Sequence, residues 1–91
     1  MPLDKPTIKR LKSQAHALKP TIIIGQKGLT PEVQEETNRA LNDHELIKIR
    51  VNTADKAERQ QITDAICTHQ LCDFVGAIGH IIIVYRPREE D

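Results

Sequence analysis

The sequence predicts an α/β fold: a compact two-layer domain in which the elements follow the order α-β-α-β-α-β-β and four strands form a mixed sheet. Three observations lead to this prediction. Three stretches repeat apolar residues every three or four positions, four short runs are rich in β-branched residues, and prolines or glycines stand at several junctions. Strands that alternate with helices pair in parallel through right-handed crossovers, whereas a closing hairpin adds an antiparallel strand.

The first predicted element is an amphipathic helix over Thr7–Leu18. Pro6 suits its first turn, and Pro20 lies where proline often follows a helix. Apolar residues at helical spacing define the face that we expect to be buried: Ile8, Leu11, Ala15 and Leu18. Basic residues at the same spacing form a second stripe beside it: Lys5, Lys9, Lys12 and His16. The helix therefore presents a basic ridge.

A short strand and a second helix follow. Ile22–Ile24 is apolar at every position, so we expect this strand to be central in the sheet or covered on both faces. The tetrapeptide Gly25-Gln26-Lys27-Gly28 then connects it to a helix that begins with Thr30 as N-cap and Pro31 in the first turn. We expect this helix to end near Asn42 or Asp43.

The remaining strands have clear patterns. Leu46–Asn52 alternates apolar and polar residues, which predicts a strand that turns Ile47, Ile49 and Val51 toward the core. Two final strands, about Cys72–Ile78 and Ile81–Arg86, are joined at Gly79-His80, where glycine can adopt the positive φ of a tight hairpin.

A third helix is predicted between these strands. Thr53 or Asp55 can cap it, and it extends to about His69. Its inward stripe is expected to consist of Ile62, Ala65 and Ile66, and His69 should face the same side.

Length and composition indicate one domain over residues 1–91 with an aliphatic core. Leucine, isoleucine, valine and phenylalanine make up about a quarter of the chain, and Phe74 and Tyr85 are the only aromatic residues. A domain of this size has little room for a deep cavity, so function is expected at the surface. The apolar runs are too short for a membrane span or a signal peptide, and two cysteines make no disulfide framework. A cytoplasmic protein is the expectation.

The charges are balanced overall but separated along the chain. Thirteen basic and thirteen acidic residues give a net charge of zero, which argues against a general polycation. Residues 1–28 nevertheless contain six lysines and arginines and a single acidic residue, Asp4, so the excess of acidic residues lies in residues 29–91. This separation favours an oriented encounter with an anionic partner.

The connection Gly25–Gly28 is the sharpest local motif. Two glycines let the backbone turn close to a phosphate, the neighbouring amides can donate to its oxygens, and Lys27 adds a positive charge. The motif is neither a Walker loop nor a dinucleotide fingerprint, and on its own it is more typical of an ordinary strand-to-helix turn. The basic ridge nearby favours the phosphate clamp.

Further basic residues lie outside the first helix. Lys48 and Arg50 are on the polar face of a strand, and Arg86 and Arg88 follow the last strand. Each of them alone is typical of a solvated surface charge. With so few aromatic side chains for stacking, the pattern favours contacts to the backbone of folded RNA over reading of bases.

Catalysis and metal binding have no support in the sequence. Ser13, the only serine, has no general base placed beside it, and Glu35 and Glu36 lie on a polar helical surface that offers no environment for acid catalysis. Four residues are of the types that bind zinc, Cys67, His69, Cys72 and His80, but the spacing of the cysteines is poor for a structural site. We therefore expect no enzyme, no metal and no cofactor.

Several motifs together resemble one family. They are Leu11-Lys12-Ser13-Gln14-Ala15-His16 with Leu18-Lys19-Pro20, Gly25-Gln26-Lys27-Gly28-Leu29-Thr30, His44-Glu45-Leu46-Ile47-Lys48, and Ile78-Gly79 followed by Tyr85-Arg86-Pro87. In this combination and order, the chain from about Ile8 to Arg88 resembles a stand-alone bacterial CRM domain of the YhbY type. Leu71 departs from the pattern, because relatives often have glycine there.

The resemblance implies a fold similar to the C-terminal domain of translation initiation factor three, and it implies RNA binding. Bacterial members are linked to precursors of the large ribosomal subunit, and plant relatives to group II intron splicing. The expected function is thus RNA binding in 50S ribosome assembly, with large-subunit ribosomal RNA or pre-ribosomal particles as partners and no membrane. The oligomeric state is open, with a monomer expected. The alternative is an adaptor that binds an acidic patch on a ribosomal or assembly protein. The expected RNA contacts are Lys9, Arg10, Lys12, His16, Lys19, Gly25, Gln26, Lys27, Gly28, Lys48, Arg50 and Arg86.

Overall fold

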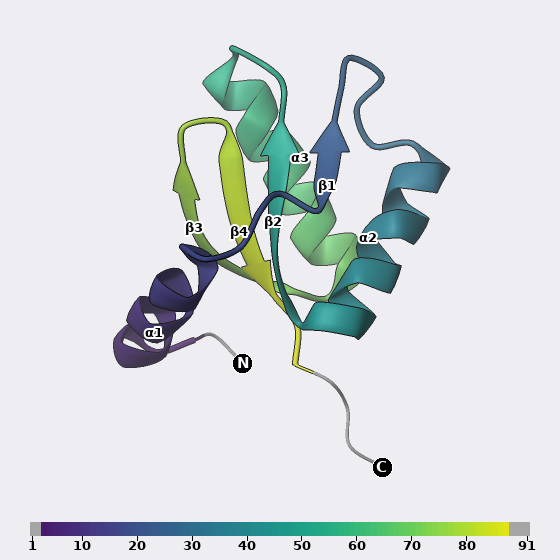
Figure 1. The fold of residues 1–91 in the computed structure, drawn as a ribbon. Helices are drawn as coiled ribbons and strands as arrows, with labels where there is room; N and C mark the ends of the chain where they lie inside the picture. The colour runs from purple at the N-terminus through teal and green to yellow at the C-terminus, as the bar shows by residue number, and fades with distance from the viewer. Residues whose placement is uncertain (1–2, 88–91) are drawn as a thin grey trace.

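The structure of the protein, a computed structural model, describes residues 3–87 and confirms the predicted order of elements (Figure 1). The elements are α1 (Lys5–Ala15), β1 (Ile22–Ile24), α2 (Pro31–His44), β2 (Leu46–Val51), α3 (Lys56–Gln70), β3 (Asp73–Ile78) and β4 (Ile81–Tyr85). The four strands form one mixed sheet in the order β1-β2-β4-β3. The predicted α/β fold with a four-stranded mixed sheet is therefore confirmed.

The last strand lies inside the sheet. β1 and β2 pair in parallel, as the crossover through α2 requires, and β4 pairs antiparallel with both β2 and β3. This arrangement leaves β1 at an edge, so the expectation that it would be central or covered on both faces was wrong. Ile22 and Ile24 are buried, whereas Ile23 points to the other face and is 61% exposed. Because all three residues of this strand are apolar, the sequence does not indicate which side chain remains exposed to solvent.

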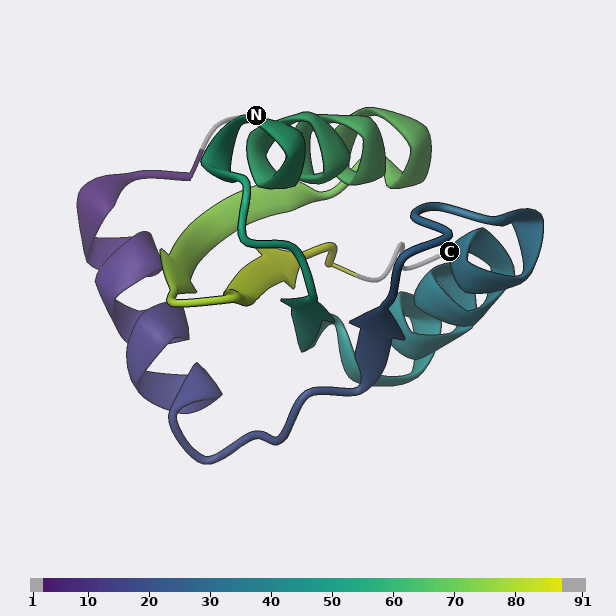
Figure 2. The same cartoon turned by 90° about the horizontal axis from the view of Figure 1, so that it is seen from above.

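Helices cover both faces of the sheet, so the domain has three layers and the prediction of two was wrong. α2 and α3 lie on one face, and α1 lies on the opposite one (Figures 1 and 2). The physical reason is that β2 and β4 carry apolar side chains on both faces. Ile47 and Ile82 belong to the core under α2 and α3, whereas Leu46 and Ile83 pack with Leu11 of α1.

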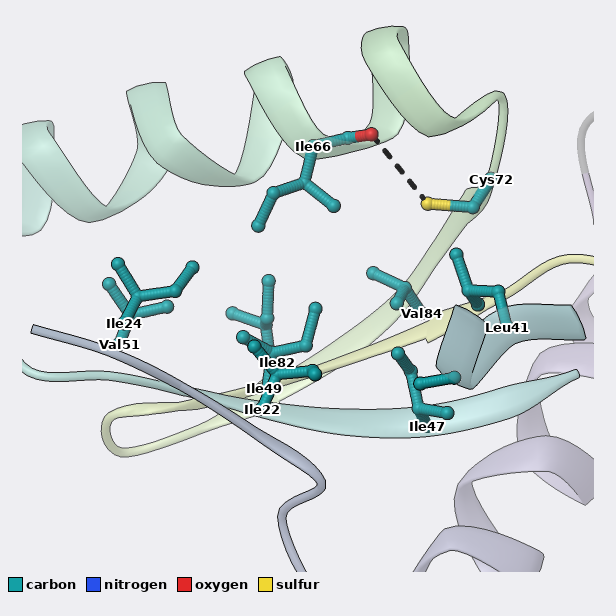
Figure 3. Packing of buried hydrophobic residues seen from close by; sticks show 11 residues of the cluster. Ile22, Ile24, Leu41, Ile47, Ile49, Val51, Ile66, Cys72, Ile82 and Val84 are labelled. Atoms are coloured by element: carbon teal, nitrogen blue, oxygen red, sulfur yellow. Dashed lines mark hydrogen bonds between the residues drawn. The ribbon is translucent and has the colours of Figure 1, made fainter. Parts of the chain in front are cut away.

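The main core is aliphatic, as predicted. Figure 3 shows isoleucines from three strands beneath Ile66 of α3, with Leu41 of α2 beside them, and each of these side chains is at most 3% exposed. Each such side chain contributes about 2 kcal/mol when it leaves water. Phe74, the single phenylalanine, is 47% exposed and takes no part in this cluster.

Side chains cap the starts of all three helices. The carboxylate of Asp4 accepts a hydrogen bond from the amide of Thr7 (2.9 Å), and the Thr30 hydroxyl accepts one from Val33 (3.2 Å), as the prediction for the second helix requires. Asp55, one of the two predicted residues, caps α3 through the amide of Ala57 (2.9 Å).

The C-terminal ends of the helices differ from the predictions. α1 ends at Ala15, and a tighter final turn that closes from Leu18 to Ala15 leaves Leu18 38% exposed, not buried. α2 continues to His44 and stops where Glu45 takes a φ of 62°. At the end of α3, Leu71 takes a φ of 52°, the left-handed conformation that glycine would adopt without strain.

The inward stripe of α3 was only partly predicted. Ile66 is buried, but Ala65 and His69 are exposed, and two polar residues, Thr63 and Gln70, face the interior instead. The Thr63 hydroxyl donates to the carbonyl of Arg59 (2.8 Å), and the Gln70 amide donates to the backbone and side-chain oxygens of Gln34 (2.9 and 2.7 Å). Hydropathy misled the prediction because these buried polar groups are satisfied by hydrogen bonds.

Candidate nucleic-acid interface

The side chain of Lys12 extends from α1 over the sheet. The helix buries Leu11 and Ala15 against the sheet, which directs the neighbouring Lys12 toward β3. A Cβ atom at Gly76 would lie 2.6 Å from Cε of Lys12 and 3.4 Å from its Nζ. The aliphatic part of the lysine side chain therefore lies directly on the glycine, and any residue with a Cβ atom at this position would collide with it. Lys12 is the only one of the predicted α1 contacts that the structure positions in this way among residues 3–87.

Lys48 and Arg50 lie on the same face of the sheet. Lys48 donates from Nζ to the carbonyl of Leu18 (3.0 Å), which ties β2 to the segment after α1. Arg50 is exposed, and its guanidinium has no hydrogen-bond partner within residues 3–87. In the register of the sheet, Lys48 and Gly76 flank Ile83, so Lys12 and Lys48 lie in one row across the strands. The central part of this face is thus cationic.

The loop between β1 and α2 forms the turn that its glycines predict. The amide of Gly28 donates to the carbonyl of Gly25 (3.0 Å), and Gly28 has a φ of 68°, which favours glycine at that position. At the tip, the amides of Gln26 and Lys27 have no partner within residues 3–87, and the Lys27 side chain is exposed. Two backbone donors and one ammonium group are therefore available for an anion.

The loop and α1 lie far apart on the molecule. In Figure 1 the loop extends from the upper end of β1, while α1 lies beside the lower end of β3, and Figure 2 shows the same separation from above. The remaining predicted contacts on α1 and the segment after it are exposed: Lys9, Arg10, His16 and Lys19. The two regions are too far apart to contact the same phosphate. The sheet face with Lys48 and Arg50 lies between them.

Arg86 has a different environment from the other predicted contacts. One of its terminal nitrogens donates to the carbonyl of Gln70 (3.0 Å), and the other donates to the carbonyl and side-chain oxygens of Asn38 (3.0 Å each) and to Asn42 (2.9 Å). The guanidinium thus joins α2 to the end of α3, beside a depression on the side away from α1. This geometry indicates a structural clamp. Arg88, also named from the sequence, lies outside the described residues.

The two cysteines interact with each other. A hydrogen bond between the thiols lowers the pKa of Cys67, and the same bond together with burial raises the pKa of Cys72. The Cys72 thiol also contacts the carbonyl of Ile66 (3.9 Å; Figure 3). Within residues 3–87, no group of three or more His, Cys, Asp or Glu side chains is placed to hold a metal ion. None of the helices in this range is long and apolar enough to cross a membrane.

Sequence reasoning missed two features of this face. Gly76 gives room to Lys12, and Ile23 and Ile78 remain exposed although both are strand isoleucines. A glycine inside a strand pattern signals a close approach, and this signal was available. The exposure of the isoleucines had no sequence signal, because it depends on how far α1 extends across the sheet.

The fold and this face define a small α/β domain with a cationic sheet surface and a glycine-bounded loop at one end. Residues 3–86 match the family described as the CRS1 / YhbY (CRM) domain, and the chain belongs to this family. The expected family resemblance is therefore confirmed, and Leu71 keeps the turn in spite of its departure from the glycine pattern.

Relatives and a solved structure agree with this assignment. The chain is 42% identical over 86 residues to a probable RNA-binding protein of Pseudomonas aeruginosa, covering 94% of this chain and 83% of the relative. It is 46% identical over 80 residues to an RNA-binding protein of Haemophilus influenzae, covering 88% and 81%. A hypothetical protein of Staphylococcus aureus, described as an RNA-binding candidate, superposes with a TM-score of 0.84 at 25% identity, covering 98% and 93%.

Proposed function

We propose that this protein binds RNA through the cationic face and the loop Gly25–Gly28, as one domain that acts by binding and not by turnover. The observation that carries the proposal is the positioning of Lys12 on Gly76, in one row with Lys48 and close to Arg50. The names of the relatives from Pseudomonas aeruginosa and Haemophilus influenzae support RNA as the ligand. The other contacts of the proposed interface are the exposed residues Lys9, Arg10, His16, Lys19, Gln26 and Lys27.

The mechanism follows from charge and from free donors. Phosphate oxygens accept hydrogen bonds from the tip amides of the loop, and the ammonium of Lys27 closes over the same group. Lys12 and Lys48 contact phosphates further along the backbone, since they lie on the sheet and not beside the loop. Arg86 keeps its structural partners and makes no RNA contact in this proposal.

The family resemblance supplies the biological context. Bacterial CRM proteins are linked to precursors of the large ribosomal subunit, so the proposed target is large-subunit ribosomal RNA in the cytoplasm, alone or in pre-ribosomal particles. Contacts to phosphates carry little sequence information, and the choice of RNA must therefore come from its shape.

The test is the salt dependence of binding to a large-subunit ribosomal RNA fragment. Lys27→Glu is compared with the unmodified protein, and Arg39→Glu serves as the matched control, because Arg39 is an exposed cation on α2, away from the proposed face. We expect a steep slope of log K against log salt that falls by roughly one or more in Lys27→Glu and stays unchanged in Arg39→Glu. A flat slope in the unmodified protein would contradict RNA binding and favour the adaptor function.

A further inference from the structure

One part of the sheet face remains uncovered. α1 and the segment that leads to β1 cross the lower half of this face in Figure 1, whereas the upper half, below the loops, has no helix in front of it. On the opposite face, the elements α2 and α3 cover a core in which Ile24, Val51 and Ile82 are buried at the same level of the sheet. The open half therefore belongs to the same surface as the proposed RNA contacts.

Strand register places four side chains in one row across this open half. Ile23 of β1 is level with Arg50 of β2, Arg50 is paired with Ile81 of β4, and Ile81 is paired with Ile78 of β3. Directly paired residues point to the same face, and neighbouring strands are about 4.8 Å apart, so the row is about 14 Å long. Arg50 thus lies between Ile23 and Ile81, and Ile78 follows Ile81 at the end of the row.

This row is unusually apolar for exposed surface. Ile23 is 61% exposed and Ile78 is 59% exposed, and together they are two of only five large apolar side chains that are exposed within residues 3–87. Leu18, a third member of this small group, lies next to the same face, because its carbonyl accepts the hydrogen bond from Lys48. Exposed apolar groups that gather in one place indicate a binding surface.

The surroundings of the row specify the partner. Lys48 precedes Arg50 on the same face of β2, and the side chain of Lys12 lies on Gly76, level with Lys48. At the end of β1, the loop begins with Gly25. An apolar strip bordered by cations and by a phosphate-binding loop is complementary to a chain with flat apolar groups on an anionic backbone. The guanidinium of Arg50, free of partners within residues 3–87, can stack on a planar ring.

We propose that unpaired nucleobases of the bound RNA pack on the row Ile23-Arg50-Ile81-Ile78. The inference rests on the proposed RNA-binding function and adds a preference for RNA with a single-stranded segment. Aliphatic side chains here take the place of the aromatic platform that the sequence lacks, and the row fills the space between the loop and α1. The contact is independent of base identity, because every base has a planar face.

The experiment compares two RNA probes, a blunt-ended hairpin and the same hairpin with a single-stranded 3′ extension that contains 2-aminopurine. Two variants change the row, the double substitution Ile23→Ser/Ile78→Ser and Arg50→Lys, which keeps the charge and removes the planar group. Leu71→Ser is the matched control, because Leu71 is 83% exposed and lies at the end of α3, outside the row. Lys27→Glu is measured in parallel.

The unmodified protein should bind the extended hairpin more tightly and change the fluorescence of 2-aminopurine. The double variant should weaken binding of the extended hairpin by about fivefold, leave the blunt hairpin unchanged and keep the salt slope, because it removes apolar contact and no charge. Arg50→Lys should also reduce the preference, and Leu71→Ser should retain it.

Three results would overturn the inference: no preference for the extended hairpin in the unmodified protein, an unchanged preference in both row variants, or equal losses for the two probes. If Lys27→Glu still weakens both probes in such a case, RNA binding stands and the row has another partner, such as a protein. If Lys27→Glu also changes nothing, the proposed function fails together with the inference.

Discussion

The substitution Gly76→Ala should weaken RNA binding and leave the free energy of unfolding nearly unchanged. The added Cβ would lie 2.6 Å from Cε of Lys12, too close for two carbon atoms, so the lysine must leave the strand. Because this atom belongs to the flexible end of the side chain, the backbone need not move. Alanine also suits a strand better than glycine by about 0.5 to 1 kcal/mol, which offsets the lost packing. The free energy of unfolding should therefore change by less than about 1 kcal/mol.

The loss of affinity can be derived from a single phosphate contact. One such contact releases about 0.9 counterion on a duplex, which is equivalent to about fivefold in affinity at roughly 0.15 M salt. Gly76→Ala should thus weaken RNA binding about fivefold and reduce the salt slope by about one. The double variant with Lys12→Ala should be no weaker than Lys12→Ala alone, since both changes remove the same contact.

Binding titrations of the four proteins, with urea unfolding of each, measure both quantities. Losses that add up in the double variant would refute the reasoning, because Gly76 would then act on something other than Lys12. Full affinity in Gly76→Ala beside a clear loss in Lys12→Ala would refute it as well.

Four further predictions concern stability and reactivity. Replacing Arg86 by lysine should lower the free energy of unfolding by about 2 to 3 kcal/mol in urea titrations, because lysine cannot supply the forked donors that join α2 to α3; an unchanged midpoint would argue against the clamp. Leu71→Gly should raise the same free energy by about 1 kcal/mol by relieving the positive φ, and a destabilised variant would contradict this. Iodoacetamide should modify Cys67 before Cys72 in the folded protein, as mass spectrometry of timed samples can determine, because the pKa of Cys67 is lowered and that of Cys72 is raised; the reverse order would be inconsistent. Asp4 has a pKa held below 3.8 by hydrogen bonds from the helix it caps, so it stabilises α1 above that pH and the contribution disappears as the pH falls through the lowered pKa; an NMR titration with a midpoint at or above 3.8 would disprove it.

The sequence predicted those parts of the fold that depend on local chemistry. Thr30 and Pro31 marked the start of α2, and Gly79, with a φ of 59°, formed the expected hairpin. Alternation in β2 identified the buried set Ile47, Ile49 and Val51. In each case, neighbouring residues alone determine the conformation.

Predictions that depend on distant contacts were less successful. The open side of Ile23 depends on where α1 lies, and the inward position of Gln70 depends on a hydrogen bond to Gln34, 36 positions earlier in the chain. The basic residues of the candidate interface were named from their charge, but their separation into a loop, a sheet row and a structural clamp at Arg86 required the tertiary structure. Charge reveals which residues can bind an anion and not which of them are free to do so.

The position of β4 has a consequence for the synthesis of this protein. The strand that lies between β2 and β3, and pairs with both, is the last strand within residues 3–87. While the ribosome is still making residues before Ile81, β3 has no neighbour, and the cores on both faces lack Ile82, Ile83 and Val84. The sheet consequently forms completely only after the residues of β4 have been synthesised, and a chain interrupted before β4 has neither a closed sheet nor the complete face on which Lys12, Lys48 and Arg50 lie.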